Sequence, residues 1–244
     1  MITIDEVKSD YGDITIIVNK IDGCCVYWQN ENCQSIADHN GVSLASYIHA
    51  IYGLIDQTGG RNVLLIGCGG GTLGTMLARA GRSVTIVDID PLSFALARQH
   101  FYLPAEVACH VADGRVFLED SNDEFDVIVV DAYVDDSIPQ QFCEADFFEL
   151  IARRLNRSGV VLFNVLVDHD FDKKADAIAG KMAKAGFEVR VLDAMGQVGR
   201  NTILACGNVA NLRRPTLVID PIVLRDDLSG ELERLHFRKW RVRG

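Results

Sequence analysis

The sequence lacks the features that would assign it to a membrane, a secretory pathway or a metal site. No apolar run approaches the roughly 20 residues that span a bilayer, and the first residues are acidic rather than a basic start followed by an apolar stretch. The seven cysteines show no paired spacing typical of zinc sites or disulfide frameworks. We therefore expect a cytoplasmic protein with reduced cysteines, no metal and no membrane contact.

Basic residues are also scarce. The chain has 24 Lys and Arg against 34 Asp and Glu, which gives a formal net charge of −10. Such a charge repels phosphate backbones and suits a cationic or neutral ligand. We therefore exclude nucleic acid and expect a small cationic substrate, and we interpret the one basic cluster, Arg238, Lys239, Arg241 and Arg243, as a solvated chain end.

The centre of the chain has the pattern of an α/β domain. From residue 62 onward, short runs that are apolar on both faces alternate with helical patterns, which is typical of a parallel sheet covered by helices on both sides. The pattern predicts a doubly wound, Rossmann-like fold. Strands are expected at 62–67, 83–88, 106–112, 125–131 and 159–167, and helices at 72–80, 92–101, 114–120, 145–155 and 171–185.

The two ends of the chain differ from this centre. Residues 14–19 and 24–29 flank an Asp22-Gly23 pair and predict a β-hairpin, and 41–55 has helical spacing before Gly59-Gly60 breaks the chain. We therefore divide the 244 residues into an N-terminal β-hairpin region with a linking helix, 1–58, and a Rossmann-like nucleoside-binding domain, 59–244. Two closing strands are expected at 187–194 and 200–207, and an irregular tail at 212–228.

A glycine-rich turn follows the first strand of the predicted sheet. Glycines at 67 and 69–71 allow a tight turn and let a ligand approach main-chain N–H groups at the positive end of a helix. The second strand ends in Asp88, 21 residues after Gly67, where a carboxylate can accept hydrogen bonds from both ribose hydroxyls. The spacing predicts a pocket for an adenosine-containing cofactor, with a purely structural turn as the alternative.

The next two strands also end in aspartate. Asp113 can reach the exocyclic amine of an adenine or cap the helix that follows it, and both roles are compatible. Asp131 ends the fourth strand, and Tyr133, Asp135 and Asp136 follow. Because open α/β sheets bind ligands at the carboxyl ends of their strands, this cluster predicts cation binding or a catalytic base, against the alternative of an ordinary loop.

The ordered series GCGGGTL, VDIDP, ADGRVFLE, FDVIVVDAYVDDSIP and FFELIARRL, within about residues 62–166, resembles spermidine synthase and its divergent bacterial relatives. The resemblance implies a class I methyltransferase-like fold. It also implies transfer of an aminopropyl group from decarboxylated S-adenosylmethionine to a polyamine, with release of methylthioadenosine and without a metal. Relatives generally assemble through the N-terminal region and a sheet edge, so a homodimer is expected.

The resemblance also implies a role for individual residues. Asp88 is similar to the acidic residue on the ribose, Asp113 to the adenine contact, and Asp131 to the aspartate that takes a proton from the attacking amine. Gln34 and Tyr47 are similar to residues that reach the nucleoside and the polyamine. We therefore assign Asp131 to catalysis, Gly67, Gly69, Gly71, Asp88, Ile89, Asp113 and Gly114 to cofactor binding, and Gln34, Tyr47, Tyr133, Asp135 and Asp136 to substrate binding.

Three departures from the family keep other functions open. Gly70 and Val134 stand where typical spermidine synthases carry aspartates, and residues 164–166 read Asn-Val-Leu instead of a Gln-Gly-Glu type sequence. One alternative is an S-adenosylmethionine methyltransferase, although Leu65 stands where such enzymes usually carry an acidic residue. Another is a nucleoside-binding relative without catalysis, whereas a dehydrogenase using NAD fits the glycine pattern poorly. We predict an aminopropyltransferase-like enzyme of undetermined donor and acceptor.

Overall fold

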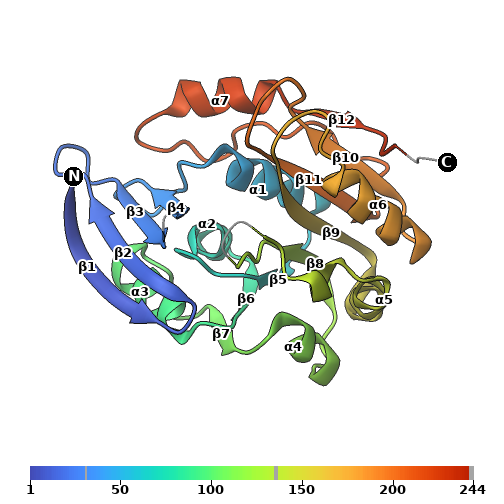
Figure 1. The fold of residues 1–244 in the computed structure, drawn as a ribbon, viewed down its shortest axis with the longest axis horizontal. Coiled ribbons are helices and arrows are strands. Elements are labelled where there is room, and N and C mark those ends of the chain that lie inside the picture. Colours follow the sequence, from blue (N-terminus) through green and yellow to red (C-terminus); the bar gives the residue numbers. More distant parts are fainter. Residues whose placement is uncertain (31, 135–136, 242–244) are drawn as a thin grey trace.

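The computed structural model describes residues 1–30, 32–134 and 137–241, and it contains two β-sheets (Figure 1). A four-stranded antiparallel sheet in the order β1-β2-β3-β4 lies at the N-terminal end. The larger sheet has eight strands in the order β12-β10-β11-β9-β8-β5-β6-β7. Its strands from β9 to β7 are parallel, and β10, β11 and β12 pair antiparallel at the other side. The predicted Rossmann-like α/β fold is confirmed.

The elements of the chain are as follows. The small sheet consists of β1 (Ile2–Ser9), β2 (Gly12–Val18), β3 (Cys25–Gln29) and β4 (Asn32–Ala37). The parallel strands are β5 (Asn62–Ile66), β6 (Ser83–Asp88), β7 (Ala108–Val111), β8 (Phe125–Val130) and β9 (Leu155–Val167), and the antiparallel ones are β10 (Val189–Asp193), β11 (Arg200–Gly207) and β12 (His236–Arg238). The helices are α1 (Ser46–Thr58), α2 (Thr72–Arg79), α3 (Pro91–His100), α4 (Gly114–Asp120), α5 (Ala145–Arg154), α6 (Lys174–Lys184) and α7 (Arg225–Glu233), with a 3-10 turn at Gln140–Cys143.

Two apolar cores explain why the central parallel strands carry apolar residues on both faces of the sheet. On β5, Val63 and Leu65 point into the core on one side of the sheet, which α1 and α2 cover, whereas Leu64 and Ile66 point into the core beneath α5 and α6. Successive strand residues face opposite sides, so a strand covered on both sides must be apolar throughout. Each fully buried aliphatic side chain stabilises the fold by about 1.5–3 kcal/mol.

The small sheet is larger than the single hairpin that the sequence predicts. The hairpin itself is confirmed, because β2 and β3 pair antiparallel around the turn that contains Asp22 and Gly23, and Gly23 has a left-handed φ of 73°. Strands β1 and β4 flank it and were not predicted. The outward residues of β1 are exposed at the sheet edge, and half of the residues of β4 are polar, so neither strand has the apolar signal of a core strand.

The linking helix begins five residues later than its apolar spacing predicts. Asp38 Oδ1 accepts hydrogen bonds from the backbone N–H groups of Asn40 (2.9 Å) and Val42 (3.0 Å), and Gly41 has a φ of 75°, so this segment forms a turn. The helix ends at Gly59, as predicted, in a left-handed C-cap. It packs in the core against the larger sheet. The domain division after residue 58 stays a prediction.

The expected irregular tail is confirmed for residues 212–224, and regular structure resumes with α7 at Arg225. The two predicted closing strands are present as β10 and β11, but α7 and β12 follow them. The interpretation of the basic cluster as a solvated end is wrong for Arg238, which pairs with Asp176 (2.8 Å) and the buried Asp193 (2.9 Å). Across the described ranges, no helix is both long enough and apolar enough to cross a membrane.

Candidate active site

The glycine turn after β5 brings the ends of two strands into backbone contact. Gly67 has a φ of 102°, and a Cβ atom there would lie 2.1 Å from the carbonyl oxygen of Asp131. The Asp131 N–H in turn donates to the carbonyl of Ile66 at 2.9 Å. Only glycine permits this approach. The turn and the end of β8 are therefore fixed relative to each other.

The same turn is closed from the other side by the small sheet. The hydroxyl of Ser35, on β4, accepts a hydrogen bond from the Gly70 N–H at 2.9 Å. A Cβ atom on Gly70 would lie 2.9 Å from the Ser35 Cβ and 3.0 Å from the Phe101 ring. Because this N–H already has a partner in the protein, it is not free to bind a phosphate.

Asp88 ends β6 directly beside the turn. Its Oδ2 accepts from the Cys68 N–H at 2.7 Å and its Oδ1 from the Asp90 N–H at 2.8 Å. Burial raises the pKa of Asp88, and the hydrogen bonds from Asp90 and Cys68 oppose that rise. A carboxylate oxygen has a second lone pair, so both oxygens can still accept from a pair of ligand hydroxyls.

Asp113 caps the helix that follows it, as one of its two predicted roles requires. Its Oδ1 accepts from the N–H groups of Arg115 (2.8 Å) and Val116 (3.3 Å), and its Oδ2 accepts from the Gln141 amide at 2.5 Å. Its contact with an adenine stays a prediction. Gly114 packs against Ile66 so closely that a Cβ atom would lie 2.4 Å from the Ile66 Cγ2.

A cavity opens at this edge of the sheet, and we call it the Asp88 cavity. The small sheet covers one side of it with residues that the sequence analysis missed: Tyr11, Tyr27 and Gln29. Nothing in their local sequence marks them, because only the packing of the small sheet brings them to the glycine turn. The predicted residues that line the cavity are Gln34, Gly67, Gly69, Asp88, Ile89, Asp113, Gly114, Asp131 and Tyr133.

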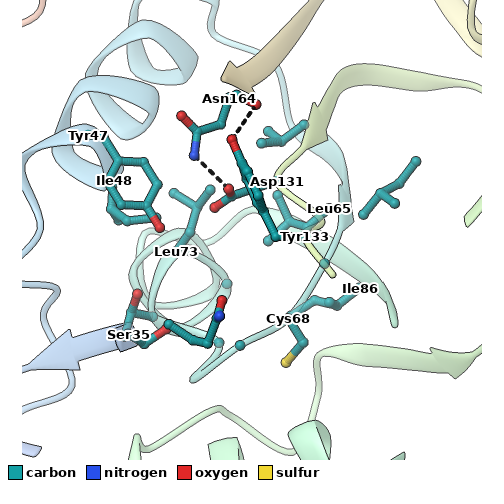
Figure 2. Close-up of a pocket in the computed structure, with 18 of the residues that line it drawn as sticks. Ser35, Tyr47, Ile48, Leu65, Cys68, Leu73, Ile86, Asp131, Tyr133 and Asn164 are labelled. Carbon is teal, nitrogen blue, oxygen red and sulfur yellow. Dashed lines mark hydrogen bonds between the residues drawn. The ribbon is translucent and has the colours of Figure 1, made fainter. Parts of the chain in front are cut away.

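A second cavity lies on the other side of Asp131, between α1 and β9, and we call it the Asn164 cavity (Figure 2). Its predicted lining residues are Gln34, Tyr47, Gly67, Gly69, Gly71, Asp131 and Tyr133, and its unpredicted ones include Ser35, Ile48, Asn164, Leu166 and Asn201. Asn164 could have been recognised as a candidate site residue from the sequence, since an amide inside the apolar half of a strand is unusual. Gln34, Asp131 and Tyr133 line both cavities, so Asp131 stands where they meet.

The Asp131 carboxylate is held by a neutral neighbour. Its Oδ1 accepts a hydrogen bond from the Asn164 side-chain amide at 2.8 Å (Figure 2). Burial raises the pKa of Asp131, and the Asn164 amide and the Tyr47 hydroxyl oppose the rise. Burial also raises the pKa of Tyr47, with the nearby Asp131 charge adding to it, so this phenol keeps its proton. Asp131 is thus a carboxylate of increased basicity.

Tyr133 contributes its ring rather than its hydroxyl to the cavities. The hydroxyl donates to the Asn164 carbonyl at 3.1 Å and accepts from the Leu166 N–H at 2.8 Å, which ties the ring to β9. The Asn164 side-chain oxygen is turned away from Asp131 (Figure 2), and it is buried without a hydrogen-bond partner among the residues described. Buried unpaired acceptors are uncommon and concentrate at functional sites.

Two predicted residues, Asp135 and Asp136, lie outside the described residues. Their neighbour Val134 is exposed and lines the Asp88 cavity. Within the ranges that the structure covers, no group of three or more His, Cys, Asp or Glu side chains is arranged to hold a metal ion. The lining of both cavities likewise contains no Lys, Arg or His among the described residues.

The fold and the two cavities define an α/β protein of the class I methyltransferase-like type with an additional N-terminal antiparallel sheet. The model of the spermine/spermidine synthase domain matches residues 46–184. The chain belongs to the spermine/spermidine synthase family.

Two curated proteins and one solved structure illustrate the relationship. A probable polyamine aminopropyl transferase of Bifidobacterium longum is 37% identical over 43% of this chain and 24% of its own length. The polyamine aminopropyltransferase of Vibrio vulnificus is 25% identical over 68% of this chain and 62% of its own. This chain therefore spans less than two thirds of either relative. The structure of a probable spermidine synthase from Corynebacterium glutamicum superposes with a TM-score of 0.77 at 18% identity, covering 97% of this chain and 90% of that one.

Proposed function

We propose that the protein transfers an aminopropyl group from decarboxylated S-adenosylmethionine to an amine and releases methylthioadenosine. The observation that carries the proposal is the position of Asp131. Its carboxylate stands where the two cavities meet, and neither cavity is lined by a cationic side chain among the described residues. A cationic donor and an amine acceptor would both find a complementary charge there.

In this proposal the Asp88 cavity binds the nucleoside. Asp88 accepts hydrogen bonds from the ribose hydroxyls, and Ile89 and Tyr27 offer apolar contacts. Asp113 accepts from the adenine amine, which then takes the place that the Gln141 amide has in the structure described. Gly67 and Gly69 leave room for the nucleoside against the turn. The sulfonium end points toward Asp131, since that residue lines both cavities.

Asp131 acts as the general base. An alkylamine has a pKa near 10, so at neutral pH it is protonated and cannot attack. Asp131 orients the ammonium and accepts its proton before the carbon–nitrogen bond forms, which frees the lone pair of the nitrogen for attack. The nitrogen bonds to the carbon of the aminopropyl group that is attached to sulfur, and the carbon–sulfur bond breaks. Its electron pair stays on sulfur, which becomes the neutral thioether of methylthioadenosine.

The same charge distribution favours the decarboxylated donor over S-adenosylmethionine. The latter carries a carboxylate, and no described Lys, Arg or His lines either cavity to pair with it. Burying an unpaired carboxylate costs several kcal/mol. Calorimetric titration of the purified protein with both donors, methylthioadenosine and NAD tests this. We expect at least about tenfold tighter binding of the decarboxylated donor, which corresponds to about 1.4 kcal/mol.

The rival activity within this fold is methyl transfer. One observation favours it: an N-terminal histidine N-methyltransferase of Emericella nidulans is 29% identical over 50% of this chain. Equal affinity for the two donors, or methyl transfer to any acceptor, would replace the aminopropyl proposal by this one. Binding of methylthioadenosine without turnover of any amine would instead favour a nucleoside-binding relative that has lost catalysis.

We also propose a homodimer in the cytoplasm, with residues 1–58 as a separate N-terminal region. The support is the family, whose members generally assemble through the N-terminal region and a sheet edge. Light scattering of the purified chain tests the oligomeric state, and a monomer at micromolar concentration would contradict it. The assignments of Gln34, Tyr47, Tyr133, Asp135 and Asp136 to substrate binding likewise stay proposals.

A further inference from the structure

The part of the Asp88 cavity around Asp113 contains a side chain that competes with a ligand. Gln141 lines this cavity, and its side-chain amide donates a hydrogen bond to Asp113 Oδ2 at 2.5 Å. The other carboxylate oxygen, Oδ1, accepts from the N–H groups of Arg115 and Val116 at the start of α4. Oδ2 is therefore the oxygen left for a ligand, and Gln141 holds the position that the proposed function gives to the adenine amine.

Adenine presents hydrogen-bonding atoms on two edges. Its amine N6 has two N–H groups, one beside the acceptor N1 and the other beside the acceptor N7. Asp113 and Gly114 suit the N1 edge, because Asp113 Oδ2 accepts from N6 and the Gly114 N–H can donate to N1. That N–H is the first of α4 and has no acceptor within the helix. The N7 edge is then left for another part of the cavity wall.

Gln141 belongs to that other part. It lies in the 3-10 turn Gln140–Cys143, which follows β8, whereas Asp113 and Gly114 lie where β7 leads into α4. Because the amine of a bound adenine takes the place of the Gln141 amide on Asp113, the displaced amide stays beside N6. A glutamine amide has a donor and an acceptor side by side, and it pairs with N6 and N7 of adenine in the major groove of DNA. Without such a partner the amide would be left unpaired in a partly buried position, which is unfavourable.

We infer that Gln141 recognises the N7 edge of the adenine: its side-chain oxygen accepts the second N6–H, and its NH2 group donates to N7. This inference rests on the proposed function, because it places the nucleoside in the Asp88 cavity. The side chain exchanges a partner in the protein, Asp113, for a partner in the ligand when the nucleoside binds. Gln141 thus adds selectivity for adenine to that provided by Asp113.

The first test removes the ligand atom. Methylthioadenosine is compared with its 7-deaza analogue, in which a C–H group replaces N7 and the rest of the molecule is unchanged. Binding of both nucleosides to the parent chain is measured by calorimetry. We expect the 7-deaza analogue to bind about tenfold more weakly, because the NH2 group of Gln141 loses its acceptor. Equal affinity for the two nucleosides would overturn the inference.

The second test removes the amide. Gln141→Met keeps a long unbranched side chain without hydrogen-bond donors, and we expect it to bind methylthioadenosine about tenfold more weakly than the parent does. It should bind the two nucleosides within about twofold of each other. The matched control is Gln140→Met on the neighbouring residue, which is exposed, lines neither cavity and bonds through its amide to Glu144 at 3.2 Å. This control should keep both affinities of the parent.

Two results with Gln141→Met would contradict the inference. Unchanged or tighter binding of methylthioadenosine would show that the amide only competes with adenine for Asp113. A preference for methylthioadenosine over the 7-deaza analogue that persists in the variant would show that N7 has another partner. Gln141→Ala serves as the second variant if Gln141→Met does not fold, with the same expected loss of the preference.

Binding and turnover distinguish the inference from the proposed function. If the preference for N7 depends on Gln141 but no amine is turned over, the inference stands and the proposed aminopropyl transfer is wrong. If amines are turned over and methylthioadenosine binds without a preference for N7, the inference is wrong and the proposed function stands. If the parent binds neither nucleoside, both are wrong.

Discussion

The two cavities that meet at Asp131 are built in different ways. In the Asp88 cavity, backbone N–H groups of turns and helix starts donate hydrogen bonds to the carboxylates of Asp88, Asp90 and Asp113. In the Asn164 cavity, the one charged side chain of the described lining is held by a side-chain amide from another strand. The carboxylates of the first cavity are thus held mainly by the backbone of strand ends and turns, whereas Asp131 is held by a side chain of the neighbouring strand. We expect the first to determine nucleoside binding and the second to determine reaction and acceptor choice.

The largest effect is expected from removing the charge where the two cavities meet, which separates the role of one cavity in reaction from that of the other in nucleoside binding. Asp131→Asn keeps the shape of the side chain but cannot accept a proton. General bases typically contribute about 10²–10⁴ in rate, so we expect turnover to fall at least about a hundredfold. Affinity for methylthioadenosine, measured by calorimetry, should change less than about threefold, since the proposed contacts to ribose and adenine are made by Asp88 and Asp113 rather than by Asp131.

The matched control for this variant is Asp123→Asn. Asp123 is an exposed loop residue that lines neither cavity, and its replacement removes the same formal charge. It should leave turnover unchanged. Full turnover by Asp131→Asn would show that the base lies elsewhere and that the two cavities are not divided as we propose.

The reciprocal experiment acts on the Asp88 cavity. A hydrogen bond to a charged group contributes roughly 1.5–3 kcal/mol, so Asp88→Ala should weaken methylthioadenosine binding about ten- to a hundredfold. Because Asp88 also accepts from the N–H groups of Cys68 and Asp90, Asp88→Asn serves as a second variant that keeps one side-chain oxygen. The melting temperature of each variant separates lost binding from lost folding. A folded Asp88→Ala that binds the nucleoside as the parent does would refute the ribose assignment.

The smallest expected effect concerns stability. Burial raises the pKa of Asp131 above its value in the unfolded chain, so the folded state holds the proton more tightly. The stability that this contributes is complete below the unfolded value and is lost as the pH rises through the folded pKa. Asparagine has no such proton to lose. We therefore expect Asp131→Asn to melt at or above the parent temperature at pH 7.5, and the difference to vanish as the pH approaches 4.

Differential scanning calorimetry over that pH range measures this effect. For a chain of this size, about 1 kcal/mol corresponds to about 2–4 °C in melting temperature. If Asp131→Asn melts below the parent by an amount that does not vary with pH, then the carboxylate stabilises the fold through contacts rather than through the cost of its charge.

The different ways in which the two cavities are built also explain which of their residues could be predicted from the sequence. Asp88, Asp113 and Asp131 each end a strand, and parallel strands joined by right-handed crossovers present those ends at one edge of the sheet. Their convergence follows from local pattern and strand direction. The same reasoning found the parallel sheet and its helices, because the central strands are apolar on both faces.

The residues that sequence reasoning missed depend on packing between distant segments. Tyr27 reaches the Asp88 cavity only because the small sheet lies against the glycine turn, and Asn201 reaches the Asn164 cavity because β11 pairs antiparallel with β9. Neither relation has a local signature. Strands β1 and β4 and helix α7 were missed for a related reason, since their polar and partly exposed residues lack the core periodicity on which the predictions relied.

The contact between Gly67 and the Asp131 carbonyl has a consequence for how this sequence can vary. Any replacement of Gly67 adds a Cβ atom, for which there is no room 2.1 Å from that oxygen. A missense mutation at this codon would displace the glycine turn and the aspartate together, so ligand binding and chemistry would be lost in one step. Gly81 also has a positive φ, of 77°, but a Cβ atom there would meet nothing within 4 Å, so this position should tolerate asparagine. Among descendants of this gene, we therefore expect glycine to be retained at codon 67 and substitutions to be tolerated at codon 81.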